Sequence, residues 1–242
     1  MNKTYRLIWN HRLNAWVVAS EVTHAGGKKA SGRTCAGVAA VVLALGTSLP
    51  LAAADLAPGA LPTGGTVVAG QADIAASGTR MDITQGSQKA IINWQGFDIG
   101  SQAQVNFAQP NASAVALNRV SGPTATRIEG QLTANGQVFL VNPNGVLFGN
   151  GARVNAGAFV ASTLNIRDDD FLAGNYSFTG TGGAIENRGT ISAAPGGYVA
   201  FIAQKITNAG TVSAPQGTVA MGAGERVTLN FAGDRLVGLS VA

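Results

Sequence analysis

The feature that most constrains the fold of this chain is a pair of segments that recur about twenty residues apart. Asn187-Arg188-Gly189-Thr190-Ile191-Ser192-Ala193 returns as Asn208-Ala209-Gly210-Thr211-Val212-Ser213-Ala214, an offset of 21 residues. Pro195-Gly196-Gly197-Tyr198-Val199-Ala200 returns as Pro215-Gln216-Gly217-Thr218-Val219-Ala220, an offset of 20 residues. Repeats of this length, made of short β-prone runs and Asn/Gly turns, predict a solenoid with one coil per repeat.

In a parallel β-helix, equivalent positions of successive coils stack in ladders. We therefore expect Ile191 to lie beside Val212 and Val199 beside Val219. An Asn at the same corner of each coil can bond to the next coil's backbone and tolerates a positive φ. The alternative is a Gly- and Ala-rich sandwich in which the internal similarity is accidental.

The sequence between residues 66 and 242 favours β-structure throughout. Short β-prone runs alternate with Gly, Asn and Ser, and the run 227–231 alternates strictly between apolar and polar residues, as in a half-buried strand. No long 3.6-residue pattern follows residue 54. The low charged fraction, 12%, fits parallel sheets buried on both faces, and the 33 glycines fit coil corners.

Residues 1–54 are predicted to be a removable export signal. A basic front precedes an apolar run at 36–45, which is shorter than the ~20 residues that a membrane-spanning helix needs. Ala52, Ala53 and Ala54 then fit a small-residue cleavage site before Asp55. We therefore expect a domain over 55–242.

Charge and reactive residues change once the leader is removed. The leader holds six of the 16 Lys and Arg and one of the 12 Asp and Glu, which leaves a net charge of −1. The basic pI is no argument for a nucleic-acid partner. His11, His24 and Cys35 all lie in the leader, so histidine bases, cysteine nucleophiles, disulfides and the usual zinc sites are excluded from the predicted domain. No cofactor is expected.

One turn has strong local chemistry. In Asn142-Pro143-Asn144-Gly145 the first Asn can accept from the backbone and Pro sets φ at the second position. Asn144 and Gly145 suit the remaining unusual angles.

Four segments in order resemble the secretion domain of filamentous haemagglutinin-like and high-molecular-weight adhesin-like exoproteins. They are Ile92 to Ile99, with an INW-x-x-F-x-I pattern, Gln109-Pro110-Asn111 through Ala116-Leu117-Asn118-Arg119-Val120, Ala134 to Gly149, and Ala158 to Leu164. Some family members have NPNL where this chain has Gln109-Pro110-Asn111-Ala112, so a role for that tetrapeptide carries over less directly. Residues 1–30 resemble the extended signal peptide of type V secreted proteins.

The resemblance implies an all-β fold, a right-handed parallel β-helix with an N-terminal β cap. It implies a secreted or cell-surface protein that passes the inner-membrane general secretion machinery. POTRA modules of a dedicated outer-membrane β-barrel would then recognise it, and it would nucleate folding outside the cell. Secretion-motif residues by this resemblance are Asn93, Trp94, Phe97, Gln109, Pro110, Asn111, Asn118, Arg119, Asn142, Pro143, Asn144 and Gly145. Family members are usually longer, so we expect a fragment or truncated product, with host glycans as candidate partners of a downstream region.

Two other functions stay open from the sequence. A sugar-binding adhesin could stack a glycan on Trp94 and Phe97, although such a pair more often lies in a core. A polysaccharide-acting β-helix enzyme would need acids on one face, but no carboxylate recurs at the coil spacing. The run 168–170 could bind Ca²⁺, although an exposed acidic loop is the more ordinary interpretation. Residues 180–183 make a poor phosphate loop because neither a Lys nor a helix pattern follows.

Overall fold

The structure is a computed structural model that describes residues 5–10, 15–20, 55–233 and 235–242. The chain divides into two units, 1–51 and 52–242. In the first, β1 (Tyr5–Asn10) and β2 (Ala15–Ser20) form an antiparallel hairpin. The predicted apolar run and the alanines of the predicted cleavage site lie outside the described residues. Within the described ranges no helix has the length and hydropathy to cross a membrane.

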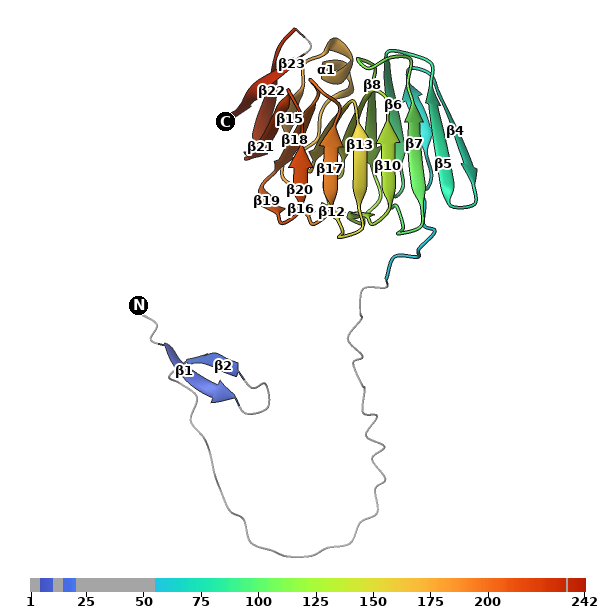
Figure 1. Cartoon of the computed structure of the whole chain (residues 1–242). Coiled ribbons are helices and arrows are strands. Elements are labelled where there is room, and N and C mark those ends of the chain that lie inside the picture. The colour runs from blue at the N-terminus through green and yellow to red at the C-terminus, as the bar shows by residue number, and fades with distance from the viewer. Residues whose placement is uncertain (1–4, 11–14, 21–54, 234) are drawn as a thin grey trace, which may run out of the picture. The chain divides into compact units, whose positions relative to one another are not determined.

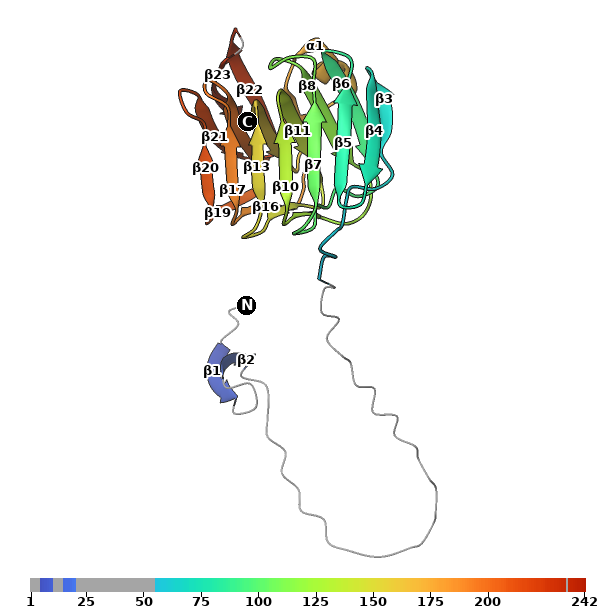
Figure 2. The same ribbon diagram turned by 45° about the vertical axis from the view of Figure 1, so that its right-hand side comes forward.

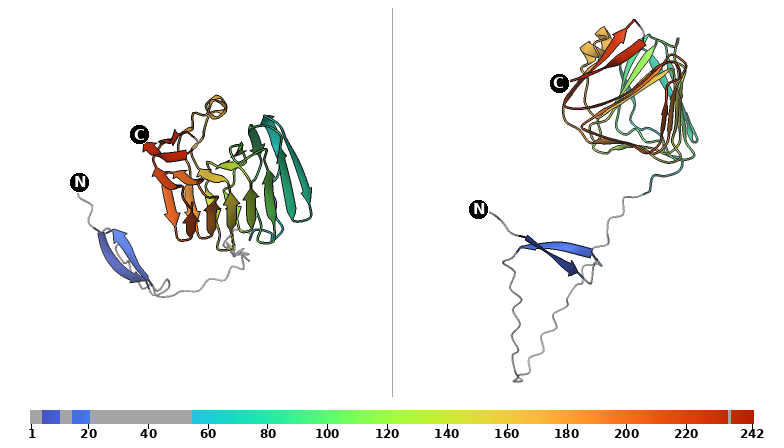
Figure 3. Two further views of the ribbon diagram at one scale, coloured as in Figure 1. Left: turned by 45° about the horizontal axis from the view of Figure 1, so that its top comes forward. Right: turned by 60° about the vertical axis from the view of Figure 1, so that its left-hand side comes forward.

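The second unit is a solenoid whose three faces are sheets of stacked strands (Figures 1 and 3). Sheet 1 has seven strands, seen side by side in Figure 2: β4 (Ala72–Ser77), β5 (Arg80–Gln85), β7 (Gln104–Ala108), β10 (Gln131–Ala134), β13 (Arg153–Ala156), β17 (Thr190–Ala193) and β20 (Thr211–Ser213). Sheet 2 also has seven: β3 (Thr66–Ala69), β6 (Lys89–Trp94), β8 (Val115–Val120), β11 (Gln137–Val141), β14 (Ala158–Ser162), β18 (Tyr198–Ala203) and β21 (Thr218–Ala223).

Two smaller sheets complete the unit. Sheet 3 forms the third face: β9 (Thr126–Ile128), β12 (Val146–Phe148), β16 (Ala184–Asn187) and β19 (Lys205–Asn208). Sheet 4 is antiparallel: β15 (Ser177–Thr179), β22 (Arg226–Ala232) and β23 (Arg235–Val241). The predicted all-β parallel solenoid is confirmed.

The predicted ladders are also present. Ile191 pairs with Val212 and Val199 with Val219 in parallel register. The Asn corner differs in detail from the expectation, because Asn187 donates from Nδ2 to the side-chain Oδ1 of Asn208, at 2.8 Å, instead of to backbone. Nor does either Asn need a positive φ, which among described non-glycine residues belongs to Gln216.

Glycine lines one corner because neighbouring coils approach too closely for a side chain. A Cβ on Gly157 would lie 2.7 Å from the carbonyl oxygen of Gly136, and one on Gly197 or Gly217 would lie closer still to the glycine below it. Real Cβ atoms do not approach a carbonyl so closely. The stacking of strands at this corner therefore depends on glycine.

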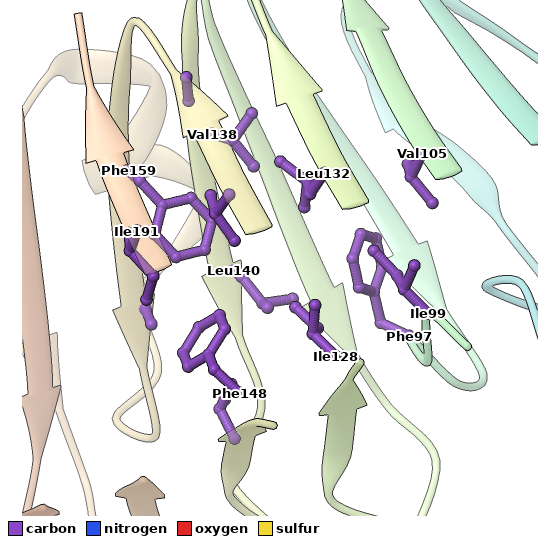
Figure 4. Packing of buried hydrophobic residues seen from close by; sticks show 14 of the residues in the cluster. Phe97, Ile99, Val105, Ile128, Leu132, Val138, Leu140, Phe148, Phe159 and Ile191 are labelled. Carbon is purple, nitrogen blue, oxygen red and sulfur yellow. The ribbon is translucent and has the colours of Figure 1, made fainter. Parts of the chain in front are cut away.

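The core inside the solenoid is a set of apolar rows, one residue from each coil (Figure 4). Phe97, Ile128, Leu140, Phe148 and Phe159 belong to it, and each is at most 1% exposed. The Phe148 ring packs edge-on against Phe159, with centroids 5.9 Å apart. Each of these coils thus buries its interior against the coils before and after it.

A second core lies on the outer face of sheet 2. There Ile91, Leu117, Phe139, Val160 and Ile202 are covered by sheet 4 and the one described helix, α1 (Asp168–Ala173). Sheet 2 is therefore buried on both faces, and every residue of β14 and β18 is buried. This accounts for strands that are continuously apolar instead of alternating.

The helix corrects the sequence analysis, which expected residues 168–170 as an exposed acidic loop. Asp168, Asp169 and Asp170 form the first turn of α1, where carboxylates favour the positive end of the helix dipole. Gly174 ends the helix in the left-handed conformation, with φ 84°. Phe171 is buried in the outer core.

The two ends of the solenoid differ. At the N-terminal end β3 and β4 run antiparallel to β6 and β5, so the predicted N-terminal cap is confirmed. Leu61, Val67 and Ile74 pack there against the inner core. At the other end β19, β20 and β21 are the last strands of their sheets among the described residues.

Candidate functional site

The twelve residues predicted from the family resemblance do not form one cluster. The structure places them in four separate sites along the solenoid: the inner core below the cap, the corner after β7, the turn after β11, and the outer face of sheet 2. In each, the side chains are engaged mainly with other parts of the fold.

Trp94 and Phe97 lie in the inner core directly under the cap. Each is 1% exposed, and their rings meet edge-on with centroids 5.4 Å apart. The Trp94 Nε1–H donates to Oδ1 of Asn118, at 3.0 Å, and Asn118 is completely buried. Trp94 and Asn118 therefore satisfy each other's hydrogen-bonding groups inside the core. Because the rings of Trp94 and Phe97 are both buried, neither offers a face on which a sugar could stack.

Asn93 points to the opposite face of the same strand, beside Arg119 in the ladder. Within the described part of the chain, its Oδ1 is buried and has no hydrogen-bond partner. A buried amide oxygen without a partner costs about 1–3 kcal/mol.

Gln109 forms the corner between sheets 1 and 2. It is 6% exposed, and its Nε2 donates to Oε1 of Gln85, at 3.0 Å, and to the Ala114 carbonyl. Its backbone N–H and C=O pair with the side chain of Asn135, both at 2.7 Å. One corner thus joins three successive coils.

Pro110 and Asn111 continue this corner outward and are exposed. Asn111 accepts from the Ser113 backbone N–H at 3.0 Å and donates to Gln88 at 2.8 Å. These contacts form an Asx turn that leads into β8.

The turn after β11 has the predicted Asn142 contact. The Oδ1 of Asn142 accepts from the Asn144 backbone N–H at 2.9 Å. Its Nδ2 also donates to Thr124 O and Thr126 Oγ1, both at 3.0 Å, so Asn142 is completely buried. Asn144 reaches back to the Gly122 carbonyl at 2.8 Å.

One expectation about this turn is wrong. Asn144 does not need a positive φ, which is found at Gly145, with φ 119°. Asn142 is the buried anchor of the turn, while Pro143 and Asn144 face solvent.

Arg119 holds the segment that leads into α1. Its guanidinium donates to Asn165 Oδ1 at 3.0 Å and to the Ile166 carbonyl at 2.7 Å, and it pairs with Asp168 at 2.7 Å. At the other end of the helix, the ammonium of Lys89 donates to the carbonyls of Phe171 and Leu172, at 3.1 and 2.9 Å.

Burial changes the titration of a few groups. It raises the pKa of Asp98, partly offset by the Arg127 backbone N–H that Asp98 accepts at 2.7 Å. Burial lowers the pKa of Lys89 and raises that of Tyr198 well above its ordinary value. In the described ranges, no three His, Cys, Asp or Glu side chains are grouped to hold a metal.

Sequence reasoning missed three partners of these motifs: Gln85, Asn135 and Lys89. A signal for Gln85 was available, because Met81 to Gln85 repeats in type as Val105 to Gln109, and the two strands pair in that register. Asn135 lies inside the motif segment but has no local feature that marks it. Lys89 contacts residues more than eighty positions away, and no sequence pattern indicates such a contact.

Comparison with known families gives two matches. The model of the TPS secretion domain, for two-partner secretion, matches residues 59–237. The model of the Extended Signal Peptide of Type V secretion system matches residues 1–50.

Individual relatives are similar over part of their length. A heme/hemopexin-binding protein of Haemophilus influenzae is 45% identical over 106 residues, which is 44% of this chain and 12% of the relative. Autotransporter adhesin NhhA of Neisseria meningitidis is 54% identical over 43 residues, 18% of this chain and 7% of the relative. The chain therefore matches about an eighth of the first relative.

The fold is also that of a solved structure. The crystal structure of the HMW1 secretion domain from Haemophilus influenzae superimposes with a TM-score of 0.68 and 35% sequence identity, covering 70% of this chain and 46% of that one. The family and the signal peptide together indicate an exported, secreted or cell-surface protein of a Gram-negative bacterium, with a cognate outer-membrane transporter as partner. The chain belongs to the family of TPS secretion domains and carries an extended signal peptide in front of that domain.

Proposed function

We propose that POTRA modules of the cognate transporter bind this domain while it is unfolded, and that its capped solenoid then nucleates the folding of further coils outside the cell. The proposed nucleation is supported by a difference between the two ends of the solenoid. Val199 is 1% and Phe201 0% exposed, whereas their ladder partners Val219 and Met221 in the last coil are 43% and 41% exposed.

The exposed row at the C-terminal end has the geometry of a template. Val219 and Met221 continue two rows of the inner core, and β21 runs parallel to β18 with its far edge available among the described strands. Coils of a solenoid are stabilised by nearest neighbours, so a formed coil lowers the cost of the next. The cap blocks the same growth at the N-terminal end.

Recognition before folding is supported by where the apolar segments lie. The segments 105–107 and 137–141 belong to β7 and β11, which pair on both sides in the folded domain. Their backbone is free for strand addition to a POTRA sheet only in the unfolded chain. Few charges lie in these segments, so such binding should depend weakly on salt.

Recognition of the unfolded chain is tested by titrating purified POTRA modules with the chain, once freshly diluted from denaturant and once prefolded. Tighter binding of the diluted chain, little changed by moderate salt, is expected. Equal affinity for both forms, or loss of binding in moderate salt, would point instead to a folded, charged surface. Secretion in cells that lack the transporter gene should also stop.

Nucleation of further coils is tested with a fusion in which a β-solenoid segment, the passenger, follows the C-terminal end of the chain. Val219→Asp should slow the acquisition of protease resistance by the passenger, because a charge then occupies the templating row. Val68→Asp, at an exposed position on the capped end, is the matched control and should leave the passenger unchanged. Equal effects of the two variants would contradict the proposal that the exposed row at Val219 acts as a template.

A glycan-binding role receives no support from the aromatic pair that suggested it, since Trp94 and Phe97 are buried. A glycan-binding screen on the folded chain would test the alternative directly.

A further inference from the structure

The segment from Asn165 to Thr179 leaves the solenoid between β14 and β16 and lies on the outer face of sheet 2. We call this segment the strap; it contains α1 and β15. Phe171 and Phe178 of the strap are completely buried against the outer core. Its β15 pairs with β22, where Phe178 faces Val227.

One end of α1 is held by the first coil. The Lys89 ammonium, on β6, donates to the last carbonyls of the helix, at Phe171 and Leu172. It also lies over the rings of Phe171 and Tyr176, 5.8 and 5.7 Å from their centroids. A cation is favourable at this end of a helix, which is the negative end of the helix dipole, and over an aromatic face.

The other end of α1 is held by the second coil. Arg119, on β8, binds Asn165, the Ile166 carbonyl and Asp168. The Arg119 side chain is 17% exposed and that of Asp168 is 49% exposed, so the ion pair is shielded from solvent mainly on the arginine side. Lys89 and Arg119 thus bind opposite ends of α1 from β6 and β8, which are neighbouring strands of sheet 2.

A helix of six residues does not hold its shape alone, because nucleation costs more than so few bonds return. Buried aromatics and these two cations therefore carry its stability. The strap is also bonded through β15 to β22 and β23, and Thr218 on β21 donates to the Leu236 carbonyl at 2.6 Å. A continuous layer thus links the first coil to the last.

We propose that Lys89 and Arg119 are a two-point latch that closes on the strap once residues 165–179 reach sheet 2, and that it couples the coils of the solenoid into one cooperative unit. Contacts between neighbouring coils alone would let the open end unfold coil by coil. With the latch closed, loss of the last coils also exposes the outer core of the first two. In the proposed function, on which this consequence rests, a closed latch prevents the translocated chain from unfolding and sliding back.

The test uses the purified chain with Lys89→Met, Arg119→Met and both together. Methionine keeps an apolar stem and removes the charge. Lys205→Met, at an exposed lysine on β19, is the matched control. Amide hydrogen exchange is followed in the strap and, as reference, in β7 and β10 of sheet 1.

In the double variant, exchange in α1 and β15 should rise at least about tenfold, while β7 and β10 and the Lys205→Met variant keep wild-type rates. Unchanged exchange in the strap of the double variant would overturn the latch. So would an equal increase in all strands, since that indicates general destabilisation.

A second measurement tests the coupling. With Trp9 and Trp16 replaced by phenylalanine, Trp94 in the first coil is the one tryptophan left in the chain, so its fluorescence can be compared with far-UV circular dichroism during urea unfolding. The two transitions should coincide in wild type and separate in the double variant. Coincident transitions in both would contradict the coupling, whereas a failure of POTRA binding would bear on the proposed function and leave these results standing.

Discussion

The two ends of the solenoid are built from the same kinds of residues but finish the core in different ways. At the N-terminal end the last core side chain, Trp94, is 1% exposed, because the chain at Gly65 passes directly over its ring and Ile74 packs beside it. At the C-terminal end Val219 and Met221 lie in equivalent core rows and are more than two-fifths exposed. Among the described strands, one end is closed and the other is open.

The edges differ as well. The cap strand β3 has only four residues and its register with β6 shifts between Val67 and Ala69, so it offers a short, bulged edge. The edge strand β21 has six residues in unbroken parallel register with β18. Short and bulged edges discourage addition of further strands, whereas long regular ones invite it. In sheet 2, therefore, the edge that favours addition of a further strand is the one at the C-terminal end.

Removing the side chain that closes the capped end should have the largest effect. Trp94→Ala should cost about 3–5 kcal/mol of unfolding free energy, because it leaves a large cavity and removes the donor to buried Asn118. Stable domains have only about 5–15 kcal/mol in total. Urea unfolding followed by circular dichroism measures the loss.

Trp94→Phe is the matched variant for that experiment. It keeps most of the ring and loses the indole N–H, so its cost should lie clearly below that of Trp94→Ala. A loss for Trp94→Ala below about 1 kcal/mol would show that the cap does not depend on this ring.

A matched pair of valines measures the difference between a closed and an open position in one ladder. Val199→Ala should cost about 2 kcal/mol, since two methyl groups leave a fully packed site. Val219→Ala, one coil further in the same row, should cost about 0.5 kcal/mol because the side chain is already 43% exposed. Urea midpoints at equal m-values provide the comparison. Equal costs would mean that the open end is covered in solution.

A charge at the open end should reduce self-association of the purified chain. We expect weak, concentration-dependent association through β20 and β21, since regular edges with an exposed apolar row promote pairing. Val219→Lys should suppress it, while Val68→Lys on the capped end should not. Sedimentation velocity over a range of concentrations distinguishes the two variants. Suppression by both would implicate a surface other than the open end.

The sequence predicted the later coils better than the earlier ones. The ladders of Ile191 with Val212 and of Val199 with Val219 follow from segments that repeat in residue type. Earlier coils share little more than alternating apolar residues, and the strap interrupts the period between β14 and β16. The cap entered only through the family resemblance, since nothing in the run 66–77 distinguishes a capping strand from a coil.

The family resemblance selected the candidate residues, but the sequence did not predict their environment. The resemblance selected Asn118, Gln109 and Asn142, yet nothing local shows that all three are buried and serve as hydrogen-bond partners of other coils. Helix α1 was missed because six residues are too few for a 3.6-residue pattern to be detected. The contacts of Lys89 and Arg119 with the strap depend on the three-dimensional stacking of coils, which periodicity alone does not give.

The smallest expected effect is a pH dependence near the capped end, where Asp98 follows β6. Burial raises the pKa of Asp98 in the folded chain above its ordinary value near 3.8. The folded state therefore holds this proton more tightly than the unfolded state. Its contribution to stability is complete below the unfolded pKa and is lost as pH rises through the folded pKa.

Asp98→Asn isolates this contribution, because the amide Oδ1 can still accept from the Arg127 backbone N–H. Relative to wild type, the variant should be more stable at pH 7 by about 0.5 kcal/mol or less, the usual size of a change outside the core. That advantage should shrink as pH falls through the folded pKa and the wild-type carboxyl becomes protonated. Urea unfolding of both proteins over this range gives the difference, in which the other titrating groups cancel. A difference that is flat, or that grows on acidification, would show that Asp98 is better solvated than its position under the cap indicates. The closure of the N-terminal end would then be less complete there than it is around Trp94.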